Sequence, residues 1–316
     1  MHTNSIYRFM GKQKALMALL VLFIAMTIAT PSFLTSENIT GLLSQSVAYT
    51  IIALGVTLTI LAGACDLSVG GIMSLAGIIT IGLQASMPTW LAAIIALVAG
   101  AIIGFINGFL SVHQKTEPFI ITLGMGLLLK GVNLELTNGR SIGGSDLAYA
   151  ELGAGSIFHV PYLVIIAVVL VVLFHLLTTR TSYGRNLYAI GGDYDVAVYS
   201  GIKALKQKWI AFVISGITAA IGGILYSARL NAGSAIYGDT TALIVNCSVV
   251  IGGTSFAGGV GGILPSVIGI LLFNLVENAM NLLALGSYTQ QAVEGVIIVF
   301  IIGLDLYTIK RKREKV

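Results

Sequence analysis

The sequence predicts an all-α, polytopic helical membrane protein, and three observations lead to that prediction. Hydrophobic residues make up 56% of the chain, charged residues make up only 9%, and the mean hydropathy is +0.95. A soluble domain carries about 25% charged residues, so the composition excludes a large soluble protein. The apolar runs are long and unbroken, whereas a transmembrane barrel shows segments of about 10 residues with alternating polarity. Helices are therefore the predicted spanning elements.

The length allows about ten transmembrane helices within one transmembrane domain covering residues 1–316. A spanning helix needs about 20 apolar residues, and the polar stretches between the apolar runs are short. A glycine-rich stretch at 62–71 separates the second and third spans, and a similar one at 250–262 follows the short eighth span. Such clusters either break helices beside a translocation path or permit close helix packing. The expected spans are 14–30, 46–63, 68–86, 90–112, 118–136, 161–178, 209–229, 241–256, 262–284 and 290–308.

The basic residues predict that both termini are cytoplasmic. Ten spans place both ends on one side of the membrane, and lysine and arginine accumulate in cytoplasmic segments. Only Lys130, Arg140 and Arg229 depart from this distribution. We therefore expect a multi-pass protein of the cell (plasma or inner) membrane, surrounded by membrane lipid, and we interpret the net charge of +4 as an orientation signal, not as a nucleic-acid surface. The cytoplasmic set is Arg8, Lys12, Lys14, Lys115, Arg180, Arg185, Lys203, Lys206, Lys208, Lys310, Arg311, Lys312, Arg313 and Lys315.

The longest polar interruption, at 178–208, is predicted to contain a short cytoplasmic helix over 193–200. Asp193 and Asp195 stand at its N-terminal end, where acidic groups suit the helix dipole. Gly201 can end it, and the pair Gly191 and Gly192 is expected to form the turn that enters it. We interpret this loop as the element that another protein pushes against. A merely solvated basic loop is the alternative.

The motifs that the sequence lacks narrow the function. No G-x-x-x-x-G-K-[ST] phosphate loop occurs, so the chain cannot hydrolyse ATP by that route, and no catalytic motif marks it as an enzyme. Cys65 and Cys247 lie apart in apolar surroundings, which favours neither a disulfide nor a metal site. Intramembrane carboxylates are few, and this weakens the alternative of an ion-coupled secondary carrier of a small polar solute. If the chain is a transporter, we expect a separate protein to supply the energy for transport.

Several motifs together resemble the membrane permease subunit of ribose-type ATP-binding-cassette sugar importers, a group related to the branched-chain amino acid permeases. The similarity runs from about residue 33 to 305. The order and spacing of the motifs make the similarity specific, although any one motif alone is weak evidence. The motifs are F-L-T-S-E-N at 33–38, I-A-L-G-V-T at 52–57, D-L-S-V-G at 66–70, N-G at 107–108, P-F-I-I-T-L-G at 118–124, Y-G-R-N-L-Y-A-I-G-G at 183–192, S-G-I at 200–202 and V-I-G-G-T-S at 250–255.

The resemblance implies a permease that forms the path for a small solute, expected to be a monosaccharide. It implies a second permease copy, expected as a homodimer, and an extracytoplasmic substrate-binding protein that delivers the solute. The cytoplasmic partner is an ATP-binding-cassette ATPase, as separate subunits or as one tandem chain, and ATP and magnesium are expected on that partner, with no cofactor on this chain. The resemblance also assigns coupling to the ATPase to the loop at 181–202. The coupling residues are Gly184, Arg185, Ala189, Gly191, Gly192, Asp193, Ala197 and Gly201.

Polar residues in apolar segments are the candidates for the translocation path. Asp66 follows the glycine-rich break, where it either lines the path or caps the next helix. At 242–246, relatives commonly carry two acidic residues in E-L-D-A-I, whereas this chain reads A-L-I-V-N. The polar residues 274, 277, 278 and 281 share one face of the ninth span, which either lines the path or bonds to other helices. The path candidates are Asp66, Asn107, Asn246, Asn274, Glu277 and Asn278.

Overall fold

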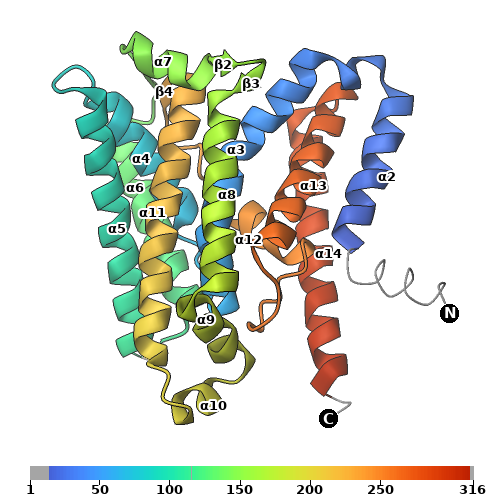
Figure 1. Ribbon diagram of the computed structural model, residues 1–316. Coiled ribbons are helices and arrows are strands. Elements are labelled where there is room, and N and C mark those ends of the chain that lie inside the picture. Colours follow the sequence, from blue (N-terminus) through green and yellow to red (C-terminus); the bar gives the residue numbers. More distant parts are fainter. Residues whose placement is uncertain (1–13, 115, 314–316) are drawn as a thin grey trace.

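The computed structural model describes residues 14–114 and 116–313, without the side chains of 113 and 304–313, and it confirms the all-α prediction. Thirteen α-helices and four two-residue strands make up the described part of the chain, and the long helices stand side by side as a bundle (Figure 1). The basic residues Arg8, Lys12, Lys115 and Lys315 lie outside the described residues. The helices are α2 (Lys14–Ala29), α3 (Ser36–Leu61), α4 (Val69–Gly82), α5 (Thr89–His113), α6 (Pro118–Thr137), α7 (Leu147–Ala154), α8 (Tyr162–Arg180), α9 (Ser182–Gly192), α10 (Tyr194–Tyr199), α11 (Ala204–Leu230), α12 (Thr241–Ile251), α13 (Ile263–Leu282) and α14 (Ser287–Arg313).

Ten helices correspond to the ten predicted spans. Six of them are long and apolar enough to cross a membrane, and four shorter apolar helices (α2, α4, α12 and the start of α14) match the remaining spans. At 1.5 Å per residue, α4 and α12 are only about 21 and 17 Å long, which is short of a hydrocarbon core of about 30 Å. The non-helical stretches 62–68 and 252–262 therefore interrupt the fold where the sequence predicted glycine-rich breaks.

The largest boundary error is at the start of the second span, and the eighth span, expected to end at 256, ends at Ile251. The sequence predicted an external loop before a span that begins at residue 46, whereas α3 begins at Ser36. The Thr35 hydroxyl accepts a hydrogen bond from the backbone N–H of Asn38 and so caps the helix. Pro31–Leu34 forms a 3₁₀ turn, η1, immediately before it. The first turns of α3 are rich in polar residues, so a hydropathy pattern does not reveal them. The capping residue Thr35 does reveal where the helix begins.

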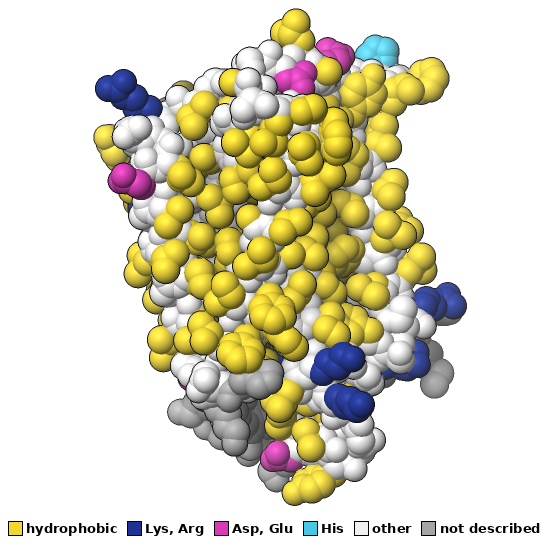
Figure 2. All heavy atoms as spheres, turned by 90° about the vertical axis from the view of Figure 1, so that its left-hand side faces the viewer, with side chains coloured by type: hydrophobic (Ala, Val, Ile, Leu, Met, Phe, Trp, Pro, Cys, Tyr) yellow, Lys and Arg dark blue, Asp and Glu magenta, His cyan; other side chains and the backbone are white. Residues whose placement is uncertain are grey.

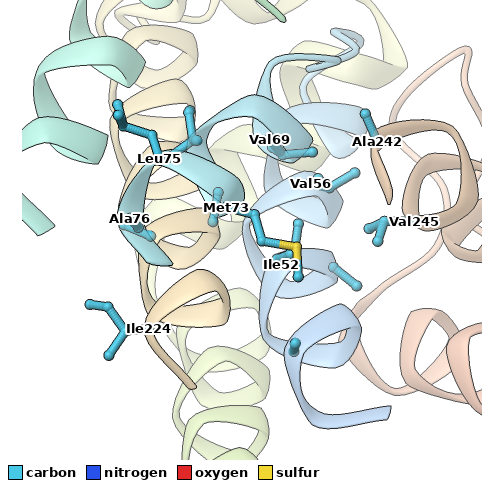
Figure 3. Packing of buried hydrophobic residues seen from close by; sticks show 14 of the residues in the cluster. Ile52, Val56, Val69, Met73, Leu75, Ala76, Ile224, Ala242 and Val245 are labelled. Carbon is cyan, nitrogen blue, oxygen red and sulfur yellow. The ribbon is translucent and has the colours of Figure 1, made fainter. Parts of the chain in front are cut away.

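Helix α3 is the centre of the bundle. From Ser46 to Leu61 nearly every side chain of α3 is buried, and α8, α11, α12 and α13 pack around it. Figure 3 shows Ile52 and Val56 of α3 facing Met73 of α4, with Val245 of α12 close by. Large apolar side chains of α3 are therefore buried from several sides.

The outer helices α5, α6 and α8 present large apolar side chains at their surfaces. In Figure 2 hydrophobic side chains cover the middle of one face, and charged side chains lie towards its upper and lower parts. A soluble protein rarely exposes a continuous apolar surface of this extent, whereas lipid tails cover such a surface at no cost. The surface therefore agrees with a multi-pass membrane protein.

The two ends of the bundle differ. One end carries α7 and two short antiparallel pairs, β1 (Ile142–Gly143) with β4 (Ala232–Gly233) and β2 (Ser156–Ile157) with β3 (Val160–Pro161). Asp146 caps α7, and the Thr89 hydroxyl together with two backbone N–H groups holds the pKa of Asp146 below its ordinary value. The opposite end carries α9, α10 and the end of α14 (Figure 1).

Candidate functional site

The predicted short helix in the polar loop is confirmed as α10, Tyr194–Tyr199. Asp193 has extended backbone angles, φ −156° and ψ 112°, and its Oδ1 accepts a hydrogen bond of 3.0 Å from the backbone N–H of Val196. This is the geometry of an N-cap, for which aspartate and asparagine are about equally suited.

Gly201 ends α10, as the sequence predicted. Its φ is +84°, a left-handed conformation that favours glycine. The N–H of Gly201 donates to the Val198 carbonyl at 2.9 Å, and the N–H of Ile202 donates to the Ala197 carbonyl at 3.1 Å. These two bonds form a Schellman motif, and Ile202 and Ala197 pack in one cluster with Ile190. The helix is thus clamped to α9 and to the start of α11.

The prediction that Gly191 and Gly192 form the entry turn was wrong. Both residues lie in the last turn of α9, and the chain turns at Asp193. Gly191 serves close packing, because a Cβ at this position would lie 1.9 Å from the Leu61 carbonyl oxygen and 2.3 Å from the Gly259 nitrogen. A Cβ at Gly192 would meet nothing within 4 Å. The two neighbours therefore have different roles.

Helix α9 joins α10 to both glycine-rich breaks. The Gly259 N–H donates to the Leu61 carbonyl at 3.0 Å, which bonds the 252–262 loop directly to the end of α3. Gly191 packs on this bond, and the Tyr188 hydroxyl donates to the Gly261 carbonyl at 3.0 Å. The two breaks that look alike in the sequence thus meet at the end of α9. A displacement of α9 must act on both.

The predicted coupling residues divide into an exposed and a buried group. Gly184 and Ala197 are buried and Gly191 is half-buried, so these pack within the chain. The exposed members are Arg185, Ala189, Gly192, Asp193 and Gly201.

The sequence analysis missed the apolar surface of α10. Val196 is 59% exposed and Tyr199 is 90% exposed, and Tyr194 and Val198 are also open to solvent. Exposed apolar side chains grouped on one short helix mark a protein contact. The run V-A-V-Y at 196–199 could have indicated it, because only Ala197 in that run is needed for internal packing.

Asp66 is the centre of a buried hydrogen-bond network at the first break. Its carboxylate is fully buried and accepts bonds from the backbone N–H and the hydroxyl of Ser68 and from the Ser215 hydroxyl, at 3.0, 2.7 and 2.7 Å. The Asn107 amide donates to the Ser68 hydroxyl at 2.8 Å. Ser68 occupies the N-cap position of α4 without a side-chain cap bond, and Asp66, two residues earlier, accepts the Ser68 N–H at the start of that helix. The network ties the 62–68 stretch to α5 and α11.

Asn246 completes this network from the other side. Its amide donates to the backbone carbonyls of Asp66 at 3.0 Å and of Ala242 at 2.8 Å, and its Oδ1 accepts from the Cys65 thiol at 3.2 Å. Three path candidates, Asp66, Asn107 and Asn246, are thus brought together around one break, although their predicted positions are far apart in the sequence. All three are buried, so they hold the break in this conformation.

The polar face of α13 forms a separate set. Glu277 accepts from the Gln45 amide at 2.9 Å, and Asn278 and Asn38 bond to each other through both amides, at 2.7 and 3.2 Å. Asn274 is buried and donates to the carbonyl one turn earlier. For Glu277 and Asn278 the geometry is that of bonds between helices, here between α13 and α3. Among the described residues no hydrogen bond joins this set to the one around Asp66.

The described chain is thus a helical bundle in which two broken spans meet beneath an exposed, capped helix. The profile of the family described as "Branched-chain amino acid transport system / permease component" matches residues 38–302, which is most of the chain. The chain belongs to this family.

Curated relatives match along nearly the whole chain. The D-allose transport system permease protein of Escherichia coli (strain K12) is 37% identical over 275 residues, covering 86% of this chain and 84% of the relative. The ribose import permease protein of the same organism is 36% identical over 302 residues, 93% of each chain. The L-arabinose transport system permease protein of that strain is 33% identical over 294 residues, 93% of this chain and 90% of the relative. No solved structure matches the chain with significance.

Proposed function

We propose that this chain is the permease subunit of an ATP-driven importer and that its solute is a monosaccharide. The observation that carries the proposal is the match to the ribose import permease over 93% of both chains, together with similar matches to permeases named for D-allose and L-arabinose. These three sugars are all small, neutral and rich in hydroxyl groups. The family match favours this function over the alternative of an ion-coupled secondary carrier.

The partners follow from the two ends of the bundle. The apolar surface of α10, with Val196 and Tyr199 at its most exposed points, supports docking of a cytoplasmic ATPase that binds ATP and magnesium. The opposite end, with α7 and the two strand pairs, receives the extracytoplasmic substrate-binding protein. A second copy of the chain completes the path as a homodimer, and both termini face the cytoplasm.

The mechanism is alternating access driven through α9. Closure of the ATPase domains displaces α10, which is clamped to α9 through Ala197 and Ile190. Helix α9 then moves the contact between Leu61 and Gly259, where both breaks meet. The network around Asp66 holds the first break against α5 and α11 until this displacement occurs. Motion at the cytoplasmic end is thereby converted into a change at the centre of the membrane.

Uptake of labelled D-ribose, D-allose and L-arabinose in cells expressing the chain tests the proposal. Uptake of one of these sugars that stops on ATP depletion and continues when an uncoupler collapses the ion gradient supports the importer. Uptake that stops with the uncoupler and survives ATP depletion supports the secondary carrier and contradicts the proposal.

A further inference from the structure

A cavity of about 200 Å³ lies between α4, α6 and the segment 235–243. It is outside the networks described above, and one wall is Leu67, which belongs to the first break. Pockets for drug-sized ligands measure about 300–1,000 Å³, so this one fits a smaller solute. Its other lining residues include Ser74, Leu123, Leu127, Lys130, Asn133 and Asp239.

An ion pair spans the mouth of this cavity. Lys130 Nζ lies 3.0 Å from Asp239 Oδ2, and the two side chains are 48% and 35% exposed. Lys130 is 12 residues into α6, a spanning helix, which places it about 18 Å along the helix axis. Charged side chains at such depth face water or protein, because exposure to lipid is costly. The Lys130 face of α6 therefore faces protein or water and not lipid.

Asn133 supplies a polar atom without a partner. The residue is fully buried, and its amide donates to the Gly71 carbonyl at 3.0 Å. Its Oδ1 has no hydrogen-bond donor among the described residues. Buried polar atoms are nearly always hydrogen-bonded, and an unpaired one marks a place where a ligand or water binds. A hydroxyl group seated in the cavity would satisfy this oxygen.

One wall of the cavity is rigid. The Gly238 N–H donates to the Ser74 hydroxyl at 2.8 Å, and that hydroxyl donates to the Ala235 carbonyl at 3.2 Å. Gly238 also packs directly on Gly70, because a Cβ at Gly238 would lie 1.9 Å from the Gly70 carbonyl oxygen. The segment 235–239 is thus pinned to α4. The side formed by α6 is held at its mouth by the ion pair.

We propose that this cavity is a solute-contact site on the translocation path and that it takes a neutral polyhydroxylated solute the size of a monosaccharide. Asn133 Oδ1 accepts a hydrogen bond from one solute hydroxyl. As the ion pair loosens, the Lys130 ammonium donates to a second hydroxyl and the Asp239 carboxylate accepts from a third. Leucines 67, 123 and 127 contact the C–H faces. The inference rests on the proposed importer function and names residues for it that the sequence analysis did not select.

The test uses the complete transporter, the chain with its ATPase and binding protein, in vesicles. Asn133→Leu keeps the side-chain size and removes the acceptor, and it also removes the amide that donates to the Gly71 carbonyl. We expect it to lower uptake of the transported sugar about tenfold, the effect of one lost hydrogen bond, while ATP hydrolysis stimulated by the loaded binding protein continues. Thr137→Val is the matched control, because Thr137 lies one turn further along α6, is buried, and bonds only to carbonyls of its own helix. Thr137→Val should leave both the sugar uptake and the stimulated ATP hydrolysis unchanged.

Lys130→Gln provides a second variant if Asn133→Leu does not fold, because Lys130 is half exposed and its removal leaves the core intact. It should also lower the amount of sugar moved for each ATP hydrolysed. Unchanged uptake in the folded variant, or an equal loss of uptake and ATP hydrolysis, would overturn the site while leaving the importer function intact. Absence of ATP-driven sugar uptake in the unaltered transporter would instead refute the proposed function itself.

Discussion

Replacing Gly191 by alanine should damage both the fold and the coupling of this permease. The added Cβ would lie 1.9 Å from the Leu61 carbonyl oxygen and 2.3 Å from the Gly259 nitrogen. These two atoms are the partners of one 3.0 Å hydrogen bond, so the methyl group must separate them or push α9 away. Both obstacles are backbone atoms, which cannot rotate aside.

The size of the effect follows from two contributions. Forcing a methyl group into a packed site costs about 1–3 kcal/mol. Leaving a buried N–H and carbonyl unpaired costs about 1–3 kcal/mol more. We therefore expect Gly191→Ala to lower the free energy of unfolding by about 2–6 kcal/mol, as the sum of these ranges.

Gly192→Ala is the matched control. The position is helical and a Cβ there meets nothing within 4 Å. Alanine is favoured over glycine in a helix by about 1 kcal/mol, so this variant should be as stable as the unaltered chain or more so. Thermal unfolding of both purified variants in mild detergent measures the difference, and ATP hydrolysed for each sugar transported measures the coupling.

The reasoning is refuted if Gly191→Ala unfolds at the same temperature as Gly192→Ala and transports normally. That result would mean that α9 does not press on the junction of the two breaks. If Gly192→Ala lowers the unfolding temperature and the coupling as much as Gly191→Ala does, the result would instead support a flexible turn at the glycine pair.

Three further variants test other parts of the account. Tyr199→Ala should leave the melting temperature unchanged, because the side chain is 90% exposed, and should weaken ATPase binding by about 2 kcal/mol in a titration of the two purified partners. An unchanged affinity would remove Tyr199 from the contact. Gly201→Ala should destabilise α10 by about 1–2 kcal/mol because of its φ of +84°, detected as faster proteolysis of the loop. Asp66→Leu should lower stability by more than Asp66→Asn, which keeps one acceptor oxygen for the two donors of Ser68, and equal melting temperatures would contradict the network.

Much of the helical architecture could be predicted because it depends on local pattern. Runs of apolar residues located the spans, and glycine clusters located the two breaks. The short helix α10 was predictable as well, because its start at Asp193 and its stop at Gly201 use residues whose capping roles are set by their own backbone geometry. The start of α3 was missed because six of its first ten residues are polar.

The candidate site was less predictable because it is built from contacts between distant segments. Asp66 bonds Ser215, 149 residues away, and Asn246 bonds the carbonyl of Asp66, 180 residues away. No spacing rule connects such residues in a single sequence. Gly191 looked like a turn residue, since a glycine pair usually indicates one, and only the approach of Leu61 and Gly259 reveals its packing role. Lys130 appeared merely as an exception to the charge distribution until its pairing with Asp239 was seen.

The central claim is that α10 couples this permease to a separate ATPase. Purification of the tagged chain from its own cells in mild detergent, followed by identification of the proteins that co-elute, tests it most directly. The account predicts that an ATP-binding-cassette ATPase co-elutes with the unaltered chain and is lost from the Tyr199→Ala variant. An unaltered chain that elutes without any ATPase would contradict the account.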